Sequence, residues 1–352
     1  MHPRLDDSEY GQRSVVIAKG DVVDNTPIRW GILSTGWIAG QFTEDLLRLP
    51  DAEVVAVGSR SPEAAQTFAT NYGIGRAHAS WQALAEDPDV DVVYVATPHS
   101  AHHAAAKLCL EAGKAVLCEK PFTLDLPTTA DLVETARARG LFLMEAMWMR
   151  TNPAIRRIQE MVAGGAIGQP THVQADFGVQ GPFPEGHRMR APELGGGALL
   201  DLGVYPVTFA YLFLGLPSAI RAWASLHPEG TDANTGLALG YESGAVATLQ
   251  CGMCGETSQR ASITGTEGRI EVPRLFFRPE AFALTRIGGP QAGVPEQVDM
   301  PIEGNGMIYE AREVNRCLRE GLTESPLIPL DSSLEIMRIL DEVRALIGVS
   351  YL

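Results

Sequence analysis

The chain has an acidic excess instead of a basic one, and it lacks long apolar runs. Lysine and arginine number 28 against 43 aspartates and glutamates, which gives a formal net charge of −15. A protein of this charge repels phosphate backbones, so we expect neither general nucleic-acid binding nor binding to anionic membranes. A membrane-spanning helix needs about 18–20 consecutive apolar residues, and we find no such run.

Cysteine is also scarce, which argues against disulfides and a structural metal. Five cysteines are an odd number in a chain of 352 residues. We therefore expect no disulfide framework, and a cytoplasmic location fits. Cys251 and Cys254 form a C-x-x-C pair, but no second pair follows at the spacing of a zinc site. We expect no metal there.

The first half of the chain alternates strands with helices. A length of 352 residues corresponds to two domains at about 150 residues each. Residues 1–27 are polar and lack the apolar stretch of a secretory signal, so we predict a flexible leader. Strands are predicted at 28–33, 53–57, 90–96, 114–118 and 141–144, and helices at 37–49, 61–72, 102–112 and 126–139. Such alternation predicts an α/β Rossmann domain over 28–147, with a parallel sheet covered on both faces.

The pattern changes after about residue 148. Consecutive strands with few helices between them indicate an α+β domain over 148–352 with a large, mostly antiparallel open sheet. Its predicted elements are a helix at 153–163, strands at 171–177, 218–225, 235–241, 245–252 and 259–264, and a closing helix at 331–347. Ser332 and Glu335 have the spacing of a capping box at the start of that last helix.

A turn typical of dinucleotide sites follows the first predicted strand. Ser34, Gly36 and Ala39 match G-x-G-x-x-G/A, with serine in the first position. Gly36 would let the backbone approach a pyrophosphate, which would lie at the positive end of the following helix. The residues predicted to bind the cofactor here are Ser34, Thr35, Gly36, Trp37 and Ile38.

The end of the second strand distinguishes the two nicotinamide cofactors. NAD sites place a carboxylate there for the ribose hydroxyls, whereas this chain has Ser59 and Arg60. Serine can donate a hydrogen bond to a 2′-phosphate, and arginine can pair with it and stack on adenine. We therefore predict NADP in preference to NAD, bound in part by Ser59 and Arg60.

Two further segments carry residues suited to alcohol oxidation. Lys120 follows a strand in C-E-K-P, and Asp201 and Tyr205 follow a glycine run at i, i+4, on one helix face. A base must take the hydroxyl proton while the carbon gives hydride to the nicotinamide. An ammonium near a phenol would lower its pKa from about 10. We predict Tyr205 as the proton acceptor, Lys120 as its electrostatic partner, and Asp201 as the group that orients the substrate or Lys120. Direct acid–base catalysis by Lys120 is the alternative.

The chain resembles the Gfo/Idh/MocA oxidoreductase family. The resemblance rests on G-I-L-S-T-G-W-I-A, A-T-P-H-S-A-H-H, C-E-K-P and G-G-G-A-L-L-D-L-G-V-Y, in this order. The segment E-A-M-W-M-R at 145–150 is similar to the subgroup of dimeric dihydrodiol dehydrogenase and NADP-dependent D-xylose dehydrogenases. The tyrosine at 205, where many relatives carry histidine, also favours this subgroup.

The resemblance implies a set of site residues and an assembly. It places Lys120 near the nicotinamide and makes Asp201 and Tyr205 the active-site pair. It also places Glu145 near the domain junction. The sheet domain would join copies into a homodimer or homotetramer. The other residues that it implies for the cofactor groove and the neighbouring pocket are Thr97, Pro98, His102, Glu119, Trp148 and Arg150.

Histidines gather near the cofactor groove and before the glycine run. His99, His102 and His103 could suggest a metal, but no acidic or thiol ligand lies near them in sequence, so we predict none. His187, with Arg188 and Arg190, contacts either polar substrate or solvent, and the sequence leaves both possibilities open.

These observations predict an NADP-dependent dehydrogenase that acts on a secondary or anomeric hydroxyl of a sugar, cyclic polyol or trans-dihydrodiol. A reductase of a keto-sugar intermediate differs only in direction and substrate. A non-catalytic NADP-binding redox sensor is the alternative from another class. The presence of Lys120, Asp201 and Tyr205 together favours an enzyme.

Overall fold

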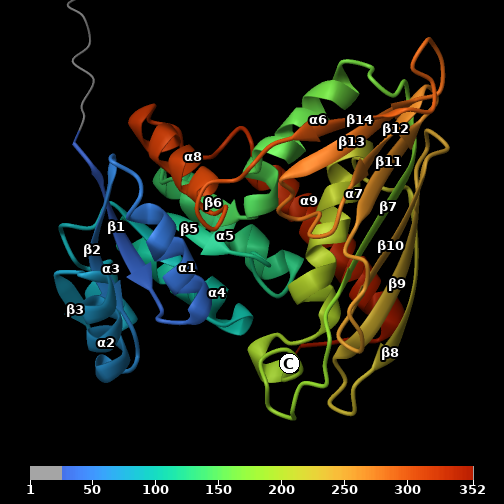
Figure 1. Ribbon diagram of the computed structural model, residues 1–352. Helices are drawn as coiled ribbons and strands as arrows, with labels where there is room; N and C mark the ends of the chain where they lie inside the picture. Colours follow the sequence, from blue (N-terminus) through green and yellow to red (C-terminus); the bar gives the residue numbers. More distant parts are fainter. Residues whose placement is uncertain (1–25, 352) are drawn as a thin grey trace, which may run out of the picture.

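Two sheets organise the molecule, with a helix-covered sheet at one side and a broad curved sheet at the other (Figure 1). The computed structural model describes residues 26–351. The predicted leader over 1–27 therefore lies almost wholly outside the described residues. The described chain confirms the predicted fold class, a Rossmann-type parallel sheet followed by a large, mostly antiparallel one.

The first sheet has six parallel strands in the order β3-β2-β1-β4-β5-β6. Its strands are β1 (Ile28–Leu33), β2 (Ala52–Gly58), β3 (Arg76–His78), β4 (Val92–Val95), β5 (Ala115–Glu119) and β6 (Leu143–Ala146). The helices between them are α1 (Trp37–Leu46), α2 (Pro62–Tyr72), α3 (Trp81–Ala85), α4 (His102–Glu111) and α5 (Leu126–Arg139). Burial on both faces explains why the central strand β4 is apolar at every position.

The second sheet has eight strands in the order β14-β13-β12-β11-β7-β10-β9-β8, and only β7 and β10 pair in parallel. The strands are β7 (Pro170–Gly178), β8 (Ala219–Leu226), β9 (Asp232–Gly240), β10 (Val246–Gly252), β11 (Ala261–Gly265), β12 (Gly268–Val272), β13 (Ala281–Arg286) and β14 (Pro295–Asp299). The helices are α6 (Pro153–Ala163), α7 (Val204–Leu214), α8 (Ile308–Arg319) and α9 (Leu330–Ile347). The inner face of this sheet packs with α7 and α9 around one large core.

Two predicted helix starts have different outcomes. The helix predicted from Ser61 is present as α2, and Ser61 caps it, because its Oγ accepts a hydrogen bond from the Ala64 amide at 3.2 Å. The capping box at Ser332 and Glu335 is wrong. Pro329 precedes α9, Ser332 donates to the Pro329 carbonyl, and Glu335 accepts from the hydroxyl of Tyr211. Ser332 thus contacts the carbonyl of the N-cap residue instead of accepting from an amide of the first turn, and Glu335 makes a tertiary contact.

Several elements have no counterpart in the sequence prediction. They are β3, α3, β12, β13, β14 and α8. Strand β3 has three residues and α3 has five, and elements this short do not show a recognisable periodic pattern of apolar residues. Helix α8 is highly polar on one side, and its apolar face packs on the Rossmann sheet beside α1. The second half of the chain thus returns to cover the first, and the predicted boundary between 147 and 148 stays a prediction.

An aspartate from α1 fixes the start of α8. The buried Oδ2 of Asp45 accepts from the amides of Met307 and Ile308, both at 2.9 Å. Its Oδ1 accepts from the Asn305 amide at 2.8 Å. These bonds satisfy amides that a helix N-terminus leaves without partners.

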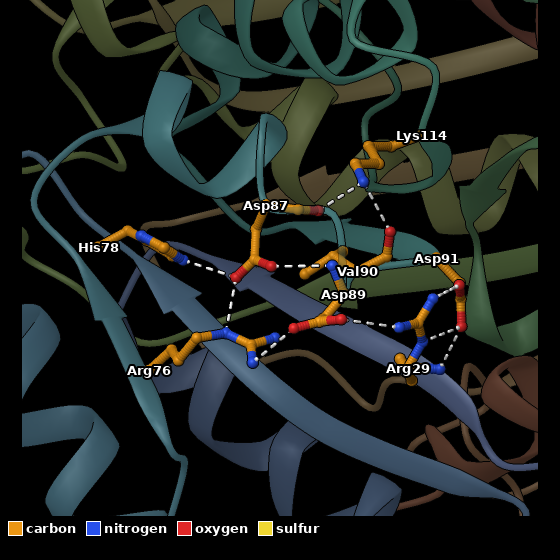
Figure 2. Close-up of polar contacts among 8 residues, drawn as sticks. All are labelled: Arg29, Arg76, His78, Asp87, Asp89, Val90, Asp91 and Lys114. Atoms are coloured by element: carbon orange, nitrogen blue, oxygen red, sulfur yellow. Dashed lines mark hydrogen bonds and ion pairs between the residues drawn. The ribbon is translucent and has the colours of Figure 1, made fainter.

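Ion pairs join the amino ends of the parallel strands, at the edge opposite the site described below (Figure 2). Arg29 at the start of β1 pairs with Asp91 at 2.6 Å. Asp87 accepts from both Arg76 and His78 at 2.8 Å. Figure 2 also draws Lys114, whose ammonium donates to the carbonyls of Asp87 and Val90, and Asp89, which pairs with Arg29. This network links four strand starts that the sequence separates by up to 85 residues, the interval from Arg29 to Lys114.

Within residues 26–351, one segment is long and apolar enough to cross a membrane by length and composition alone, although no unbroken apolar run occurs in it. An 18-residue window within residues 192–214 has a mean hydropathy of 1.5, and 78% of that window is buried inside the protein. The segment contains the glycine run and α7, which lies in the centre of the larger core.

Candidate functional site

The structure brings Lys120 together with Asp201 and Tyr205 from the other half of the chain. Lys120 follows β5 at the carboxyl edge of the parallel sheet, and its Nζ lies 2.9 Å from both the carbonyl oxygen and the Oδ1 of Asp201. The same Nζ lies 5.0 Å from the centroid of the Tyr205 ring. Burial would lower the pKa of Lys120, but Asp201, Tyr205 and Glu119 raise it above its ordinary value.

Asp201 is held on both carboxylate oxygens. Oδ1 faces Lys120 and, at 3.6 Å, the Nε2 of His99, whereas Oδ2 accepts from Arg188 at 3.1 Å. Burial would raise the pKa of Asp201, but these three groups outweigh it and hold the pKa well below its usual range. Asp201 therefore stays ionised and contacts Lys120, one of the two groups that we predicted it to orient. The contact also gives Arg188 a partner that the sequence did not reveal.

The helix that carries this pair is not a regular α-helix. Asp201 lies in a π-helical turn at Leu199–Gly203, and Tyr205 lies in the first turn of α7. π-Turns often occur at functional sites because the extra residue changes the direction of side chains. The expected i, i+4 face is thus modified, but both residues still reach Lys120.

The pKa of Tyr205 differs from our expectation. Lys120 does lower it, but burial is the larger effect and raises the pKa of Tyr205 to about 12. The Oη accepts a hydrogen bond from the Nε1 of Trp148 at 2.6 Å. The prediction of a pKa below 10 is therefore wrong for the protein as it stands, because desolvation outweighs one ammonium. The phenol keeps its proton at neutral pH.

Aromatic rings surround the Tyr205 ring, and sequence reasoning missed two of them. Phe177 at the end of β7 lies 5.5 Å from Tyr205, and Phe277 lies 5.2 Å from it. Phe177 and Phe277 stack at 4.4 Å, and Trp148 lies 6.0 Å from Phe277. These four residues form the aromatic cluster. Pairwise sequence signals could not find it, since its members lie up to 129 positions apart.

The dinucleotide turn has the backbone that its sequence pattern requires. Ser34 has a φ of 111°, in the left-handed region that favours glycine, which explains why this position is glycine in the general fingerprint. A Cβ added to Gly36 would meet no atom within 4 Å. No side chain caps α1, and Trp37 at its first position is 76% exposed. The open helix end suits a pyrophosphate. Thr35 and Ile38 lie in the same turn and are half-buried.

The second segment that we predict to bind the cofactor lies between β4 and α4. His102 is buried, and its two ring nitrogens lie 2.8 Å from the Pro121 carbonyl and 2.9 Å from the Thr97 carbonyl. Burial lowers the pKa of His102 to about 3. The ring contacts both the E-K-P turn and this segment, which includes Pro98, and as a neutral imidazole it donates to one of the two carbonyls. The Oγ1 of Thr97 is buried without a partner among the described residues, so it can serve a bound molecule.

The remaining predicted residues have internal partners. Glu119 accepts from the hydroxyl of Tyr94 and, at 3.1 Å, from the Lys120 amide, and burial raises the pKa of Glu119 to about 7. Glu145 accepts from Ser333 at 2.6 Å. Arg150 is buried, and its Nη1 donates to Ser332 in α9 at 2.6 Å. Glu145 and Arg150 therefore join the two halves of the molecule.

No group of three or more potential metal ligands occurs among residues 26–351. His99 contacts the Gly195 carbonyl at 3.0 Å, and His103 contacts Asp131 at 2.6 Å. Of the C-x-x-C pair, Cys251 is buried and Cys254 exposed. His187 stacks on Phe183 at 5.0 Å, and Arg190 pairs with Glu229 at 2.5 Å.

The adenosine end of a dinucleotide would lie at Ser59 and Arg60. Ser59 follows β2, and its Oγ accepts from the Ser61 amide at 3.2 Å, which leaves the hydroxyl proton free to donate. Arg60 is exposed and forms no ion pair with any residue that the structure describes. An extended anionic dinucleotide fits these three features together: the open glycine turn, the unpartnered Thr97 hydroxyl, and an arginine that forms no ion pair with the described residues.

Comparisons with known proteins identify the family of the chain. Residues 28–147 match the model of the oxidoreductase family with an NAD-binding Rossmann fold, and residues 155–271 match the GFO/IDH/MocA C-terminal domain. Trans-1,2-dihydrobenzene-1,2-diol dehydrogenase from Mus musculus is 39% identical over 334 residues, which is 92% of this chain and 98% of the relative. The enzyme of the same name from Homo sapiens is 38% identical over the same shares.

Solved structures share the whole architecture. A 3-ketoreductase from Actinomadura kijaniata, in complex with NADP and TDP-benzene, matches with a TM-score of 0.80 and 30% identity over 91% of this chain and 98% of that one. An aldose-aldose oxidoreductase from Caulobacter crescentus, 23% identical with a TM-score of 0.81, shares the fold over 91% of this chain and 97% of its own. The chain therefore belongs to the GFO/IDH/MocA family and is an NAD(P)-dependent oxidoreductase acting on CH–OH groups.

Proposed function

We propose that the protein is an NADP-dependent dehydrogenase that oxidises a ring hydroxyl of a trans-dihydrodiol or a similar cyclic diol. The observation that carries the proposal is the Lys120–Tyr205 pair, 5.0 Å from Nζ to ring centroid, enclosed by the aromatic cluster. Aromatic rings bind the apolar face of an unsaturated ring, while the ammonium and phenol bind its hydroxyls. The mouse relative named above acts on a diol of this kind.

The chain's own groups supply binding and proton transfer. A bound nicotinamide supplies the hydride acceptor. Lys120 stays protonated because Asp201 holds it, so its ammonium can bind the reacting oxygen and stabilise negative charge there. Tyr205 Oη is the group that exchanges a proton with that oxygen. The Trp148 indole holds Oη at 2.6 Å and fixes its direction.

The charges of the site favour Tyr205 over Lys120 as the group that transfers the proton. The pKa of Lys120 lies above its ordinary value, so its ammonium releases a proton poorly near neutral pH. The pKa of Tyr205, about 12, also leaves it protonated. A protonated phenol is ready to donate to an alkoxide during reduction, and a rise in pH prepares it as a base for oxidation.

The second candidate function is reduction of a keto-sugar, and the protonated state of Tyr205 favours it. The 3-ketoreductase of known structure shares 30% identity with this chain. One experiment separates the possibilities. Purified protein is given trans-dihydrodiols, xylose and other aldoses with NADP and NAD, and keto-sugars with NADPH, and absorbance at the nicotinamide band is followed. Diol oxidation with NADP supports the proposal, keto-sugar reduction alone replaces it, and tight NADPH binding without any turnover points to a sensor.

The cofactor preference and the assembly are part of the proposal. Arg60 offers a positive charge where NAD-specific sites carry a carboxylate, which supports NADP. The outer face of the large sheet supports a homodimer or homotetramer. It exposes Trp223, 74% accessible on β8, and Val246, 40% accessible on β10, among polar side chains. The acidic excess and the few cysteines support action on small polyhydroxylated molecules in the cytoplasm.

A further inference from the structure

A tryptophan at the start of the neighbouring helix α3 lies against Arg60, where the adenosine end of a dinucleotide would bind. The Cζ of Arg60 lies 5.3 Å from the centroid of the Trp81 ring. Trp81 begins α3, and its partly buried ring packs on the core cluster between the sheet and α4. The indole is therefore anchored on one side and offers its other side to the guanidinium. Sequence reasoning gave Trp81 no role.

This contact differs from the other arginine–aromatic contacts of the described chain. Arg312 lies over Tyr309 but also pairs with Glu303, and Arg344 lies over Tyr351 but also pairs with Asp341. Arg60 has no carboxylate partner among the described residues. The ring is thus its one described anchor, and its positive charge stays available to an anion.

The topology brings the two residues together at the correct edge. β2 and β3 are parallel neighbours, and the Ser59 amide donates to the His78 carbonyl at 3.1 Å, which joins the two carboxyl ends. A Cβ on Gly58 would lie 2.8 Å from the Cβ of Leu84, so glycine is needed for α3 to come this close. The ribose of adenosine lies at the end of this second strand in Rossmann folds.

We propose that Trp81 is a positioning residue that sets the preference for NADP by holding Arg60 toward the 2′-phosphate. The inference rests on the proposed NADP preference. A free arginine side chain loses rotamer entropy when it is fixed. An aromatic face restricts the guanidinium beforehand and leaves its N–H edge free to make a forked contact with phosphate oxygens. Trp81 acts through Arg60 and touches no phosphate itself.

The test measures dissociation constants of NADPH and NADH by nicotinamide fluorescence. The proteins are the unaltered chain, Trp81→Leu, Trp81→Phe, Arg60→Ala and the double variant Arg60→Ala/Trp81→Leu. Leucine keeps apolar contact with the core, whereas phenylalanine also keeps an aromatic face. An exposed cation–π contact is worth about 0.5–1 kcal/mol, so Trp81→Leu should weaken NADPH about two- to fivefold. NADH should bind unchanged, and Trp81→Phe should recover most of the NADPH affinity.

The double variant decides between positioning and a general structural effect. If Trp81 acts through Arg60, Trp81→Leu has no further effect on NADPH once Arg60 is alanine. Equal losses for NADPH and NADH, or a full additional loss in the Arg60→Ala background, would overturn the role of Trp81. A protein that binds NADPH no better than NADH before any substitution removes the NADP preference itself. A clear preference that Trp81→Leu leaves intact removes only the role of Trp81.

Discussion

At the scale of single residues, the site depends on two buried groups, one of which stays charged and the other neutral. Asp201 keeps Lys120 charged, while burial keeps Tyr205 neutral. The free energy that Lys120 contributes to the phenolate is smaller than the desolvation that opposes it. A site of this kind keeps a proton on Tyr205 and a positive charge on Lys120, whose Nζ lies 5.0 Å from the centroid of the Tyr205 ring.

Replacement of Tyr205 by phenylalanine tests its chemical role. We expect Tyr205→Phe to lower turnover by about 10²–10⁴-fold, since proton transfer contributes a factor of this size. NADPH affinity should stay the same, because the ring and its aromatic neighbours remain. Initial-rate assays at saturating substrate measure turnover, and fluorescence titration measures NADPH affinity. Unchanged turnover would exclude Tyr205 as the acid–base group.

The pH profile of oxidation follows from the raised pKa of Tyr205. With a pKa of about 12, the base form increases tenfold for each pH unit between neutral pH and pH 11. We therefore expect the rate of diol oxidation to rise with pH over pH 7–10, and reduction to show no such rise. A flat oxidation profile would mean that the bound cofactor and substrate lower the pKa of Tyr205 to neutrality.

Lys120→Met tests the electrostatic pairing through the same profile. The ammonium lowers the pKa of Tyr205, so its loss should move the oxidation profile to still higher pH and reduce turnover at every pH. Methionine retains the length and apolar contacts of the lysine stem. A lower rate with an unshifted profile would restrict Lys120 to substrate binding.

At the scale of elements, α8 depends on a side chain from another helix. Asp45 in α1 accepts from the amides of Met307 and Ile308, so a cap that sequence rules seek locally comes from 262 positions away. Asp45→Ala should lower the free energy of unfolding by about 1–3 kcal/mol, because buried amides lose their acceptor. Urea unfolding followed by circular dichroism measures this change.

Arg48→Ala provides the control for that substitution. Arg48 is 62% exposed and lies 3.9 Å from Asp45, so its removal should change the free energy of unfolding by less than about 0.5 kcal/mol. An equal loss in both variants would assign the stabilisation to the ion pair instead of the helix cap.

At the scale of the whole molecule, a helix from the second half of the chain completes the core of the first half. The chain leaves the Rossmann sheet after β6, builds the large sheet, and returns with α8 to cover the face that α1 leaves open. A separate 26–147 fragment would expose the apolar residues of the parallel sheet that α8 covers. We expect this fragment to aggregate or remain unfolded by circular dichroism and gel filtration, while the full chain folds. A monomeric, cooperatively unfolding fragment would show that α8 is dispensable.

The sequence by itself determined the alternation of strands and helices, the dinucleotide turn and the residue types of the site. These are local properties, since a few consecutive residues are enough to indicate a strand buried on two faces, a glycine-type turn or a reactive side chain. Tertiary structure decided the rest. It placed the aromatic cluster around Tyr205, brought Trp81 to Arg60, and gave α8 its cap. It also set the pKa of Tyr205, because desolvation depends on everything packed around a group, which no short stretch of sequence records.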